Sequence, residues 1–255
     1  MDDAQLVALA VDLAAQAGTA ILAIRRQGFD VRRKQDRSPV TEADEAAEAI
    51  IAAGLRSATP EIPVIAEEET AARGAGEAPA VFWLVDPLDG TREFIAKNGE
   101  FTVNVGLVEN HRPVLGAVLL PVTGVLYAAC GPGTATRTIG DAPPVPIRAR
   151  RAPASGAIVA QSRSHSDEAK IAAYAATLPN AARRVMGSSA KFCLLAAGEA
   201  DYYPRFGTTM EWDTAAGHAV LEAAGGSVRT LDGAPLAYGK PGFRNPDFIA
   251  TGAAD

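Results

Sequence analysis

An unbroken apolar run, Val81 to Val85, ends abruptly in the turn Asp86-Pro87-Leu88-Asp89-Gly90-Thr91. Such a short apolar run, bounded by turn residues, is typical of a strand buried on both faces. Asp86 and Asp89 lie three residues apart around a proline, so both carboxylates can point to one spot. Amide N–H groups in such a turn would suit a phosphate group. An ordinary polar turn would explain the same residues, because Asp, Pro and Gly favour turns for their own reasons.

Three other acidic segments lie where a strand is expected to end or a helix to begin. They are Thr41-Glu42-Ala43-Asp44, Glu67-Glu68-Glu69 and Glu211-Trp212-Asp213-Thr214. Each has a simpler explanation, as a capping box, a solvated charge run and a helix N-cap, respectively. Together they predict one cleft, because strand ends and helix starts often converge on the ligand site of an α/β protein. Several carboxylates sharing a cleft need a cation, and oxygen ligands favour magnesium over zinc.

The chain divides into two halves with different patterns. Residues 4–26 and a segment starting at Thr41 have helical periodicity, residues 70–80 are expected to form a loop, and residues 102–130 predict an antiparallel meander. After a Gly-, Pro- and Arg-rich stretch, strands and helices alternate, which indicates α/β layering. We therefore expect an N-terminal half over residues 1–135, a linker over 136–149 and a C-terminal half over 150–255.

Composition excludes several classes of protein. The net charge of −6 argues against a dedicated nucleic-acid binder, which usually carries a basic surplus. Cys130 and Cys193 do not make a disulfide framework, so we expect both to be reduced core residues. The acidic N-terminus does not resemble a secretory signal. The uncharged run from Pro113 to Cys130 is interrupted by proline and glycine and predicts strand–turn–strand rather than a membrane span. The cytoplasm is the expected location, and peripheral membrane association stays open.

The four acidic segments, taken together, resemble the inositol monophosphatase superfamily over nearly the whole chain. The pairing of the Asp-Pro-Leu-Asp-Gly-Thr turn with a distant Trp212-Asp213 is the most specific part of this resemblance. Further segments are similar to the branch of 3′(2′),5′-bisphosphate nucleotidases. They are Ser38-Pro39-Val40-Thr41, Asp89-Gly90-Thr91-Arg92-Glu93-Phe94, Gly187-Ser188-Ser189-Ala190-Lys191-Phe192-Cys193 and Tyr203-Pro204-Arg205-Phe206. The resemblance implies an αβαβα layered sandwich, a sugar-phosphatase-like fold with its site between the two halves.

The resemblance also implies a role for each matching residue. Glu67, Asp86 and the Leu88 carbonyl would hold one Mg²⁺, and Asp86, Asp89 and Asp213 would hold a second, with a weaker third ion near Glu67. Asp44 and Thr91 would orient the attacking water, so Asp44, Thr91 and Glu67 are the expected catalytic residues. The amides of Gly90 and Thr91 would hold phosphate oxygens. The remaining substrate contacts would come from the second half: Ser188, Ser189, Lys191, Arg205 and His165.

The activity implied is Mg²⁺-dependent hydrolysis of the 3′-phosphate of 3′-phosphoadenosine 5′-phosphate to AMP, with the sulfated nucleotide as a further candidate substrate and with inhibition by lithium. The expected partner is this small nucleotide bisphosphate, without nucleic acid or an integral membrane segment, in a monomer or a homodimer. One alternative is an inositol monophosphatase or a fructose-1,6-bisphosphatase-like sugar phosphatase. Another alternative is a catalytically silent scaffold. Because every expected metal ligand is present in the sequence, a loss of activity would be hard to explain.

Overall fold

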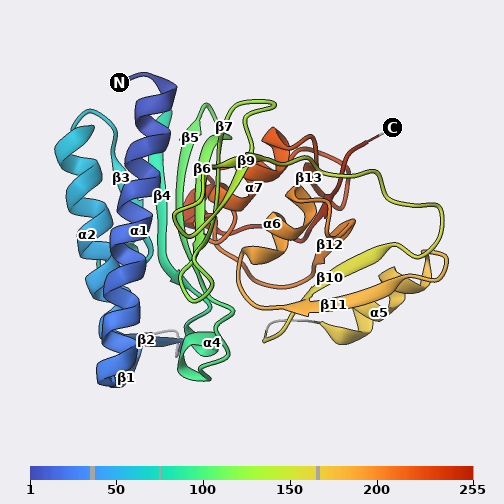
Figure 1. Cartoon of the computed structure of the whole chain (residues 1–255), viewed down its shortest axis with the longest axis horizontal. Coiled ribbons are helices and arrows are strands. Elements are labelled where there is room, and N and C mark those ends of the chain that lie inside the picture. Colours follow the sequence, from blue (N-terminus) through green and yellow to red (C-terminus); the bar gives the residue numbers. More distant parts are fainter. Residues whose placement is uncertain (35–37, 75, 165–166, 255) are drawn as a thin grey trace.

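Five layers of secondary structure are stacked side by side in the computed structural model, which describes all residues except 35–37, 75, 165–166 and 255. Helices α1 (Asp3–Gln27) and α2 (Glu42–Ala58) cover one face of a seven-stranded sheet. Helices α6 (Ala190–Ala196) and α7 (Ala215–Ala223) separate that sheet from a five-stranded sheet, and α5 (Glu168–Ala176) covers the far side (Figure 1). This arrangement is the expected αβαβα sandwich.

The seven-stranded sheet forms the core of the N-terminal half. Its order is β3 (Val64–Ala66), β4 (Val81–Asp89), β5 (Thr102–Glu109), β6 (Arg112–Leu120), β7 (Val125–Cys130), β8 (Thr136–Ile139) and β9 (Val145–Pro146). Strands β3 and β4 are parallel, and every other neighbouring pair is antiparallel, so the predicted meander is confirmed. Trp83 and Val85 pack towards α1 and α2 while Phe82 and Leu84 pack towards the second sheet, which explains the continuous apolar run.

The long N-terminal helix packs through small residues. The helix α1 starts with a capping box between Asp2 and Gln5 and presents Ala10, Leu13, Ala14, Ala17 and Ile21 to the core. Its length and apolar content alone would allow it to cross a membrane. However, one of its faces is buried against α2 and the sheet, as expected for the core helix of a folded domain.

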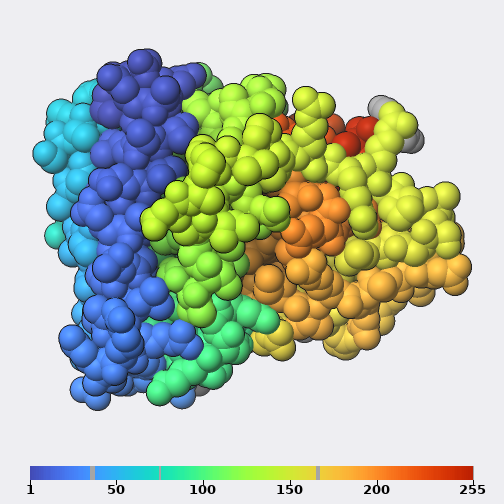
Figure 2. Space-filling model, viewed as in Figure 1, coloured from blue at the N-terminus to red at the C-terminus, as the bar shows by residue number. Residues whose placement is uncertain are grey.

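The predicted linker takes part in the first sheet. Residues 136–139 and 145–146 form the strands β8 and β9 at its edge, and the chain then crosses the front of the molecule towards the second half (Figure 2). These strands are short and partly exposed, so their sequences lack the alternation of apolar and polar residues that predicts a strand. Residues 70–73, expected in a loop, instead complete the helix α3 (Glu67–Arg73).

The second sheet has the order β11 (Ala182–Met186), β10 (Ile158–Ser162), β12 (Tyr202–Arg205), β14 (Phe248–Thr251) and β13 (Ser227–Thr230). Strands β10, β11 and β12 are parallel, whereas β14 runs antiparallel between β12 and β13. The α/β layering that the alternating pattern indicated is present in this half. The remaining elements are the short strands β1 (Val31–Arg33) and β2 (Pro39–Thr41), the helix α4 (Thr91–Ile95) and a 3₁₀ turn at Pro241–Phe243.

Two glycines let α7 lie directly on the first sheet. A Cβ atom at Gly116 would come within 2.1 Å of the Ala216 carbonyl oxygen, and one at Gly106 within 3.0 Å of the Ala216 nitrogen. The helix can therefore approach β5 and β6 only because these positions have no side chain. The close approach fixes the start of α7 and, with it, the position of Asp213.

Candidate active site

The acidic segments from both halves converge on one pocket. Strand β4 ends in the Asp-Pro-Leu-Asp-Gly-Thr turn, where its register with β5 shifts between Asp86 and Asp89. Asp86 and Asp89 both line the pocket, as do Glu67 from the start of α3 and Asp213 from just before α7. Three of the four predicted acidic segments therefore line one pocket, and the fourth is connected to it by the hydrogen bond between Asp44 and Thr91.

Strand pairing explains why two of these carboxylates meet. Ala66 on β3 lies opposite Val85 on the parallel strand β4, so the next residue of each strand emerges at the same edge of the sheet. Those residues are Glu67 and Asp86. Together with Asp213 they each place one carboxylate oxygen within 4.8 Å of the others. Three hard oxygen donors at such distances are a set that suits Mg²⁺.

Burial and mutual repulsion raise the pKa values of the carboxyl groups in this cluster. Burial, followed by the neighbouring carboxylates, raises the pKa of Asp86 and of Asp213 well above the ordinary value. Burial also raises the pKa of Asp89 to about 6, although the Lys191 ammonium and the Ser189 N–H oppose the shift. Such crowding is unfavourable without positive charge, so the residues fit a divalent cation in chemistry as well as in position.

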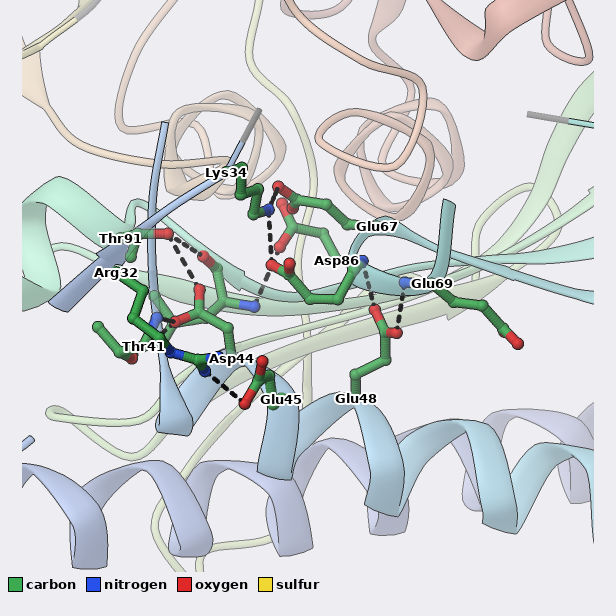
Figure 3. Close-up of polar contacts among 12 residues, drawn as sticks. Arg32, Lys34, Thr41, Asp44, Glu45, Glu48, Glu67, Glu69, Asp86 and Thr91 are labelled. Atoms are coloured by element: carbon green, nitrogen blue, oxygen red, sulfur yellow. Dashed lines mark hydrogen bonds and ion pairs between the residues drawn. The ribbon is translucent and has the colours of Figure 1, made fainter. Parts of the chain in front are cut away.

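Part of that charge comes from Lys34, which lies in the basic stretch from Arg25 to Arg37 that the sequence suggested is a solvated loop. Lys34 Nζ lies 2.6 Å from Glu67 Oε1 and 2.7 Å from Glu68 Oε1, with only 11% of its side chain exposed (Figure 3). Burial would lower the pKa of Lys34, but the two carboxylates outweigh it and raise this pKa. Burial, together with Glu67, raises the pKa of Glu68 to about 8 despite Lys34.

The expected pair of Asp44 and Thr91 is joined directly. The Thr91 hydroxyl donates to Asp44 Oδ1 at 3.1 Å, and Asp44 Oδ2 accepts from the Thr41 N–H at 2.8 Å and the Thr41 hydroxyl at 2.7 Å (Figure 3). The capping box is thus formed, and the same carboxylate also accepts from the Thr91 hydroxyl. Asp44 is fully buried, whereas Thr91 lines the pocket.

The turn at Gly90 has the geometry that the sequence predicted. Gly90 adopts a left-handed φ of 94°, which favours glycine, and α4 begins at the next residue. The Leu88 N–H donates to Asp86 Oδ1 at 3.0 Å, which tightens the turn from inside. Gly90, Thr91 and Leu88 all line the pocket.

The second half contributes the opposite wall of the pocket. Ser188, Ser189, Lys191 and Arg205 all line it. The Ser189 N–H donates to the Asp89 carboxylate, and Ser189 Oγ donates to Asn104 Oδ1 at 2.6 Å. His165, also expected here, lies outside the described residues.

Lys191 and Arg205 are buried cations rather than extended surface groups. Lys191 Nζ donates to the Met186 carbonyl at 3.1 Å and to that of Ser188, and it lies 5.1 Å from the centre of the Tyr203 ring. Burial lowers the pKa of Lys191 to about 8, against the attraction of Asp89. Arg205 Nη2 donates to the Thr208 carbonyl at 2.9 Å.

A family comparison agrees with this geometry. The model of the inositol monophosphatase family matches residues 2–252. The chain belongs to the inositol monophosphatase family. Members of this family are metal-dependent, which agrees with the acidic cluster.

Several similar proteins from the family are 3′(2′),5′-bisphosphate nucleotidases named CysQ. The chain is 45% identical to CysQ of Salmonella typhimurium over 242 residues, which cover 94% of this chain and 96% of that protein. It is also 45% identical to CysQ of Escherichia coli strain K12 over 239 residues, or 92% and 95% of the two chains. The crystal structure of CysQ from Bacteroides thetaiotaomicron superposes with a TM-score of 0.83 at 38% identity, covering 98% of each chain.

A further buried acid, Glu48, lies beside the acidic cluster and was not predicted from the sequence. Glu48 lies one turn after Asp44 on α2 and is 8% exposed. Like charges four residues apart on a helix repel, and both acids sit beside the apolar positions Ala43, Ala47 and Ile51. Two acids four residues apart, next to the apolar face of a helix, were the sequence signal that could have predicted a buried, hydrogen-bonded Glu48.

Proposed function

We propose that the protein is a Mg²⁺-dependent phosphomonoesterase that removes the 3′-phosphate of 3′-phosphoadenosine 5′-phosphate, giving AMP and inorganic phosphate. The observation that carries this proposal is the cluster of Glu67, Asp86 and Asp213 in a pocket that also contains the buried cations Lys191 and Arg205. The similarity to CysQ nucleotidases over nearly the whole chain supports the nucleotide as substrate.

Each metal would be held by oxygen atoms of the cluster. We assign Glu67, Asp86 and the Leu88 carbonyl to one ion, and Asp86, Asp89 and Asp213 to a second, with a weaker third ion near Glu67. When bound, the magnesium ions would lower the pKa of the attacking water and stabilise the charge on the leaving oxygen.

The Thr91 and Asp44 pair would position the attacking water. Because the Thr91 hydroxyl donates its proton to Asp44, its oxygen keeps lone pairs that can accept a hydrogen bond from a water molecule. Water then supplies the oxygen that bonds to phosphorus, the bond between phosphorus and the 3′ oxygen breaks, and that oxygen receives a proton. The Gly90 and Thr91 amides would hold phosphate oxygens during this displacement.

Selectivity would arise at the opposite wall. A nucleotide bisphosphate carries a second phosphate, and Lys191, Arg205, Ser188 and Ser189 offer positive charge and hydroxyl groups on that wall. An inositol or sugar monophosphate has no second phosphate that could bind to Lys191 and Arg205. The sulfated nucleotide carries the same 3′-phosphate and is a candidate second substrate.

Phosphate release tests the proposal directly. Equal concentrations of 3′-phosphoadenosine 5′-phosphate, inositol 1-phosphate and fructose 1,6-bisphosphate would be compared with Mg²⁺ and with EDTA. We expect a strong, Mg²⁺-dependent preference for the nucleotide. Preference for an inositol or sugar phosphate would keep the metal chemistry and overturn the substrate. Absence of release from all three would favour a catalytically silent scaffold.

A further inference from the structure

The helix that carries Glu67 is not held by a hydrophobic face. Helix α3 is seven residues long and contains no buried residue, so apolar packing does not fix its orientation. Ala66, its N-cap residue, has no side chain that can accept from the first turn. The pairing of β3 with β4 places the start of α3. Polar contacts must therefore determine how its first turn is oriented and how the Glu67 side chain is presented.

The carboxylate of Glu48, from the neighbouring helix α2, supplies the missing cap. Its Oε2 accepts from the Glu68 N–H at 2.7 Å, and its Oε1 accepts from the Glu69 N–H at 2.8 Å (Figure 3). Both oxygens are thus used, each by a backbone amide of the first turn of α3. Hydrogen bonds to a charged acceptor at a helix N-terminus are among the stronger ones in proteins.

Burial makes this arrangement specific. Glu48 is 8% exposed, and a buried carboxylate is costly unless its oxygens are hydrogen-bonded. Any movement of α3 away from α2 would break both hydrogen bonds between the Glu48 carboxylate and the N–H groups of Glu68 and Glu69. The contact is therefore expected to be rigid rather than one of several equivalent surface pairs.

The constraint reaches Glu67 through one peptide plane. The Glu68 N–H that Glu48 binds belongs to the planar unit that contains the Cα atom of Glu67. Fixing that plane fixes the point from which the Glu67 side chain extends towards Asp86 and Asp213. A loss of this anchor would let the three carboxylates separate.

We propose that Glu48 is a positioning residue for the cation site, holding Glu67 at the distance from Asp86 and Asp213 that a divalent ion requires. The proposal rests on the metal-dependent function inferred above and adds a residue without contact to the ion or substrate. Neighbouring groups that support metal ligands typically change metal affinity by about 10–100-fold when they are replaced.

The test is Mg²⁺ binding to the purified full-length protein without nucleotide, measured by calorimetry, together with the melting temperature in EDTA. Glu48→Gln keeps the length of the side chain but turns an amide NH₂ towards one of the two backbone N–H groups. We expect it to weaken Mg²⁺ binding by about 10-fold or more. Glu48→Ala should weaken it further, and if that variant fails to fold, Glu48→Gln carries the test.

Two matched variants separate positioning from charge and from general stability. Glu69→Gln removes one charge from the same helix, where Glu69 pairs with Arg56 and Arg73, without touching the cap. Asp167→Ala removes the cap of the distant helix α5, where Asp167 accepts from the Lys170 N–H at 3.1 Å. We expect both to bind Mg²⁺ nearly as the parent chain does.

Either of two results would overturn the proposal. A Glu48→Gln variant that lowers the melting temperature as Asp167→Ala does but leaves Mg²⁺ affinity unchanged would make Glu48 a structural cap alone. A Glu48→Gln variant that weakens binding no more than Glu69→Gln does would make the effect one of charge. Because binding is measured without nucleotide, failure here is distinct from failure of the substrate assignment.

Discussion

The Thr91 hydroxyl donates to the Asp44 carboxylate at 3.1 Å across 47 residues of sequence. One partner opens α4 and the other lies in the first turn of α2. The helix cap at Thr41 occupies the second oxygen of Asp44, so the carboxylate is fully engaged and fixed in orientation. Thr91 is consequently the member of the pair that faces the pocket.

Replacing Thr91 tests the pair. Thr91→Val keeps the shape but removes the hydroxyl, and we expect it to lower kcat by about 10²–10⁴-fold with little change in KM. Thr91→Ser keeps the hydroxyl and should recover most of the activity. Steady-state kinetics at saturating Mg²⁺ would measure both. Equal activity in the valine and serine variants would show that the Thr91 hydroxyl takes no part in catalysis.

The metal assignment is tested by Asp89→Asn. The change removes a proposed ligand without altering side-chain size, so kcat should fall by more than about 100-fold. The melting temperature in EDTA should not fall, because the substitution neutralises one of the crowded buried carboxylates. Asp141→Asn, in the exposed turn after β8, is the control for losing a carboxylate. Near-normal turnover by Asp89→Asn would refute the assignment.

The opposite wall is tested by Arg205→Ala. We expect it to raise KM for the nucleotide bisphosphate more than KM for a monophosphate, because only the bisphosphate places a second phosphate there. Arg244→Ala is a matched control, since Arg244 Nη2 also contacts Thr208, at 2.9 Å from its hydroxyl. Equal increases for both substrates would exclude Arg205 from binding the second phosphate.

Without metal, stability should depend on pH with a defined sign. The folded protein raises the pKa of Asp86, Asp89 and Asp213, so it binds protons more tightly than the unfolded chain does. Stability in EDTA should therefore increase as the pH falls from about 8 towards 6, the pKa of Asp89 being about 6.

Saturating Mg²⁺ should abolish or reverse this trend, because the ion replaces the protons as counter-charge. Thermal melting at both pH values, with EDTA and with Mg²⁺, measures the effect. Asp213→Asn should flatten the pH dependence in EDTA. A metal-free protein that is more stable at pH 8 than at pH 6 would contradict the prediction.

The contact between α7 and the first sheet can be tested at Gly116. Gly116→Ala places a methyl group against the Ala216 backbone, and we expect a loss of about 1–3 kcal/mol in the free energy of unfolding. Because the start of α7 also carries Asp213 into the pocket, Mg²⁺ affinity should fall as well. Gly76→Ala, where the added methyl group meets open space, is the control in denaturant titrations.

Local patterns were sufficient for much of the fold. Helical periodicity predicted α1 and α2, and strand alternation with turn residues predicted the meander of β5, β6 and β7. The strands β8, β9 and β14 were not predicted. The first two are short edge strands, and β14 pairs with β12 and β13, whose positions in the sheet depend on tertiary packing.

The sequence by itself determined which chemical groups the protein has. The Asp-Pro-Leu-Asp-Gly-Thr turn, the acids at the starts of helices and the family resemblance were all readable from it. Only the tertiary structure decided the contacts and distances by which those groups meet. Parallel pairing of β3 with β4 brings Glu67 to Asp86, and the glycines of β5 and β6 admit the helix that delivers Asp213.

The roles of Lys34 and Glu48 depended on the same kind of contact. Lys34 pairs with glutamates more than thirty positions away, and Glu48 caps a helix twenty residues further along the chain. Local sequence does not specify the partner of either residue, because water can solvate an ammonium or a carboxylate group at any exposed position. Burial in the folded chain makes each of them costly without its partner, and that cost fixes the geometry of the site.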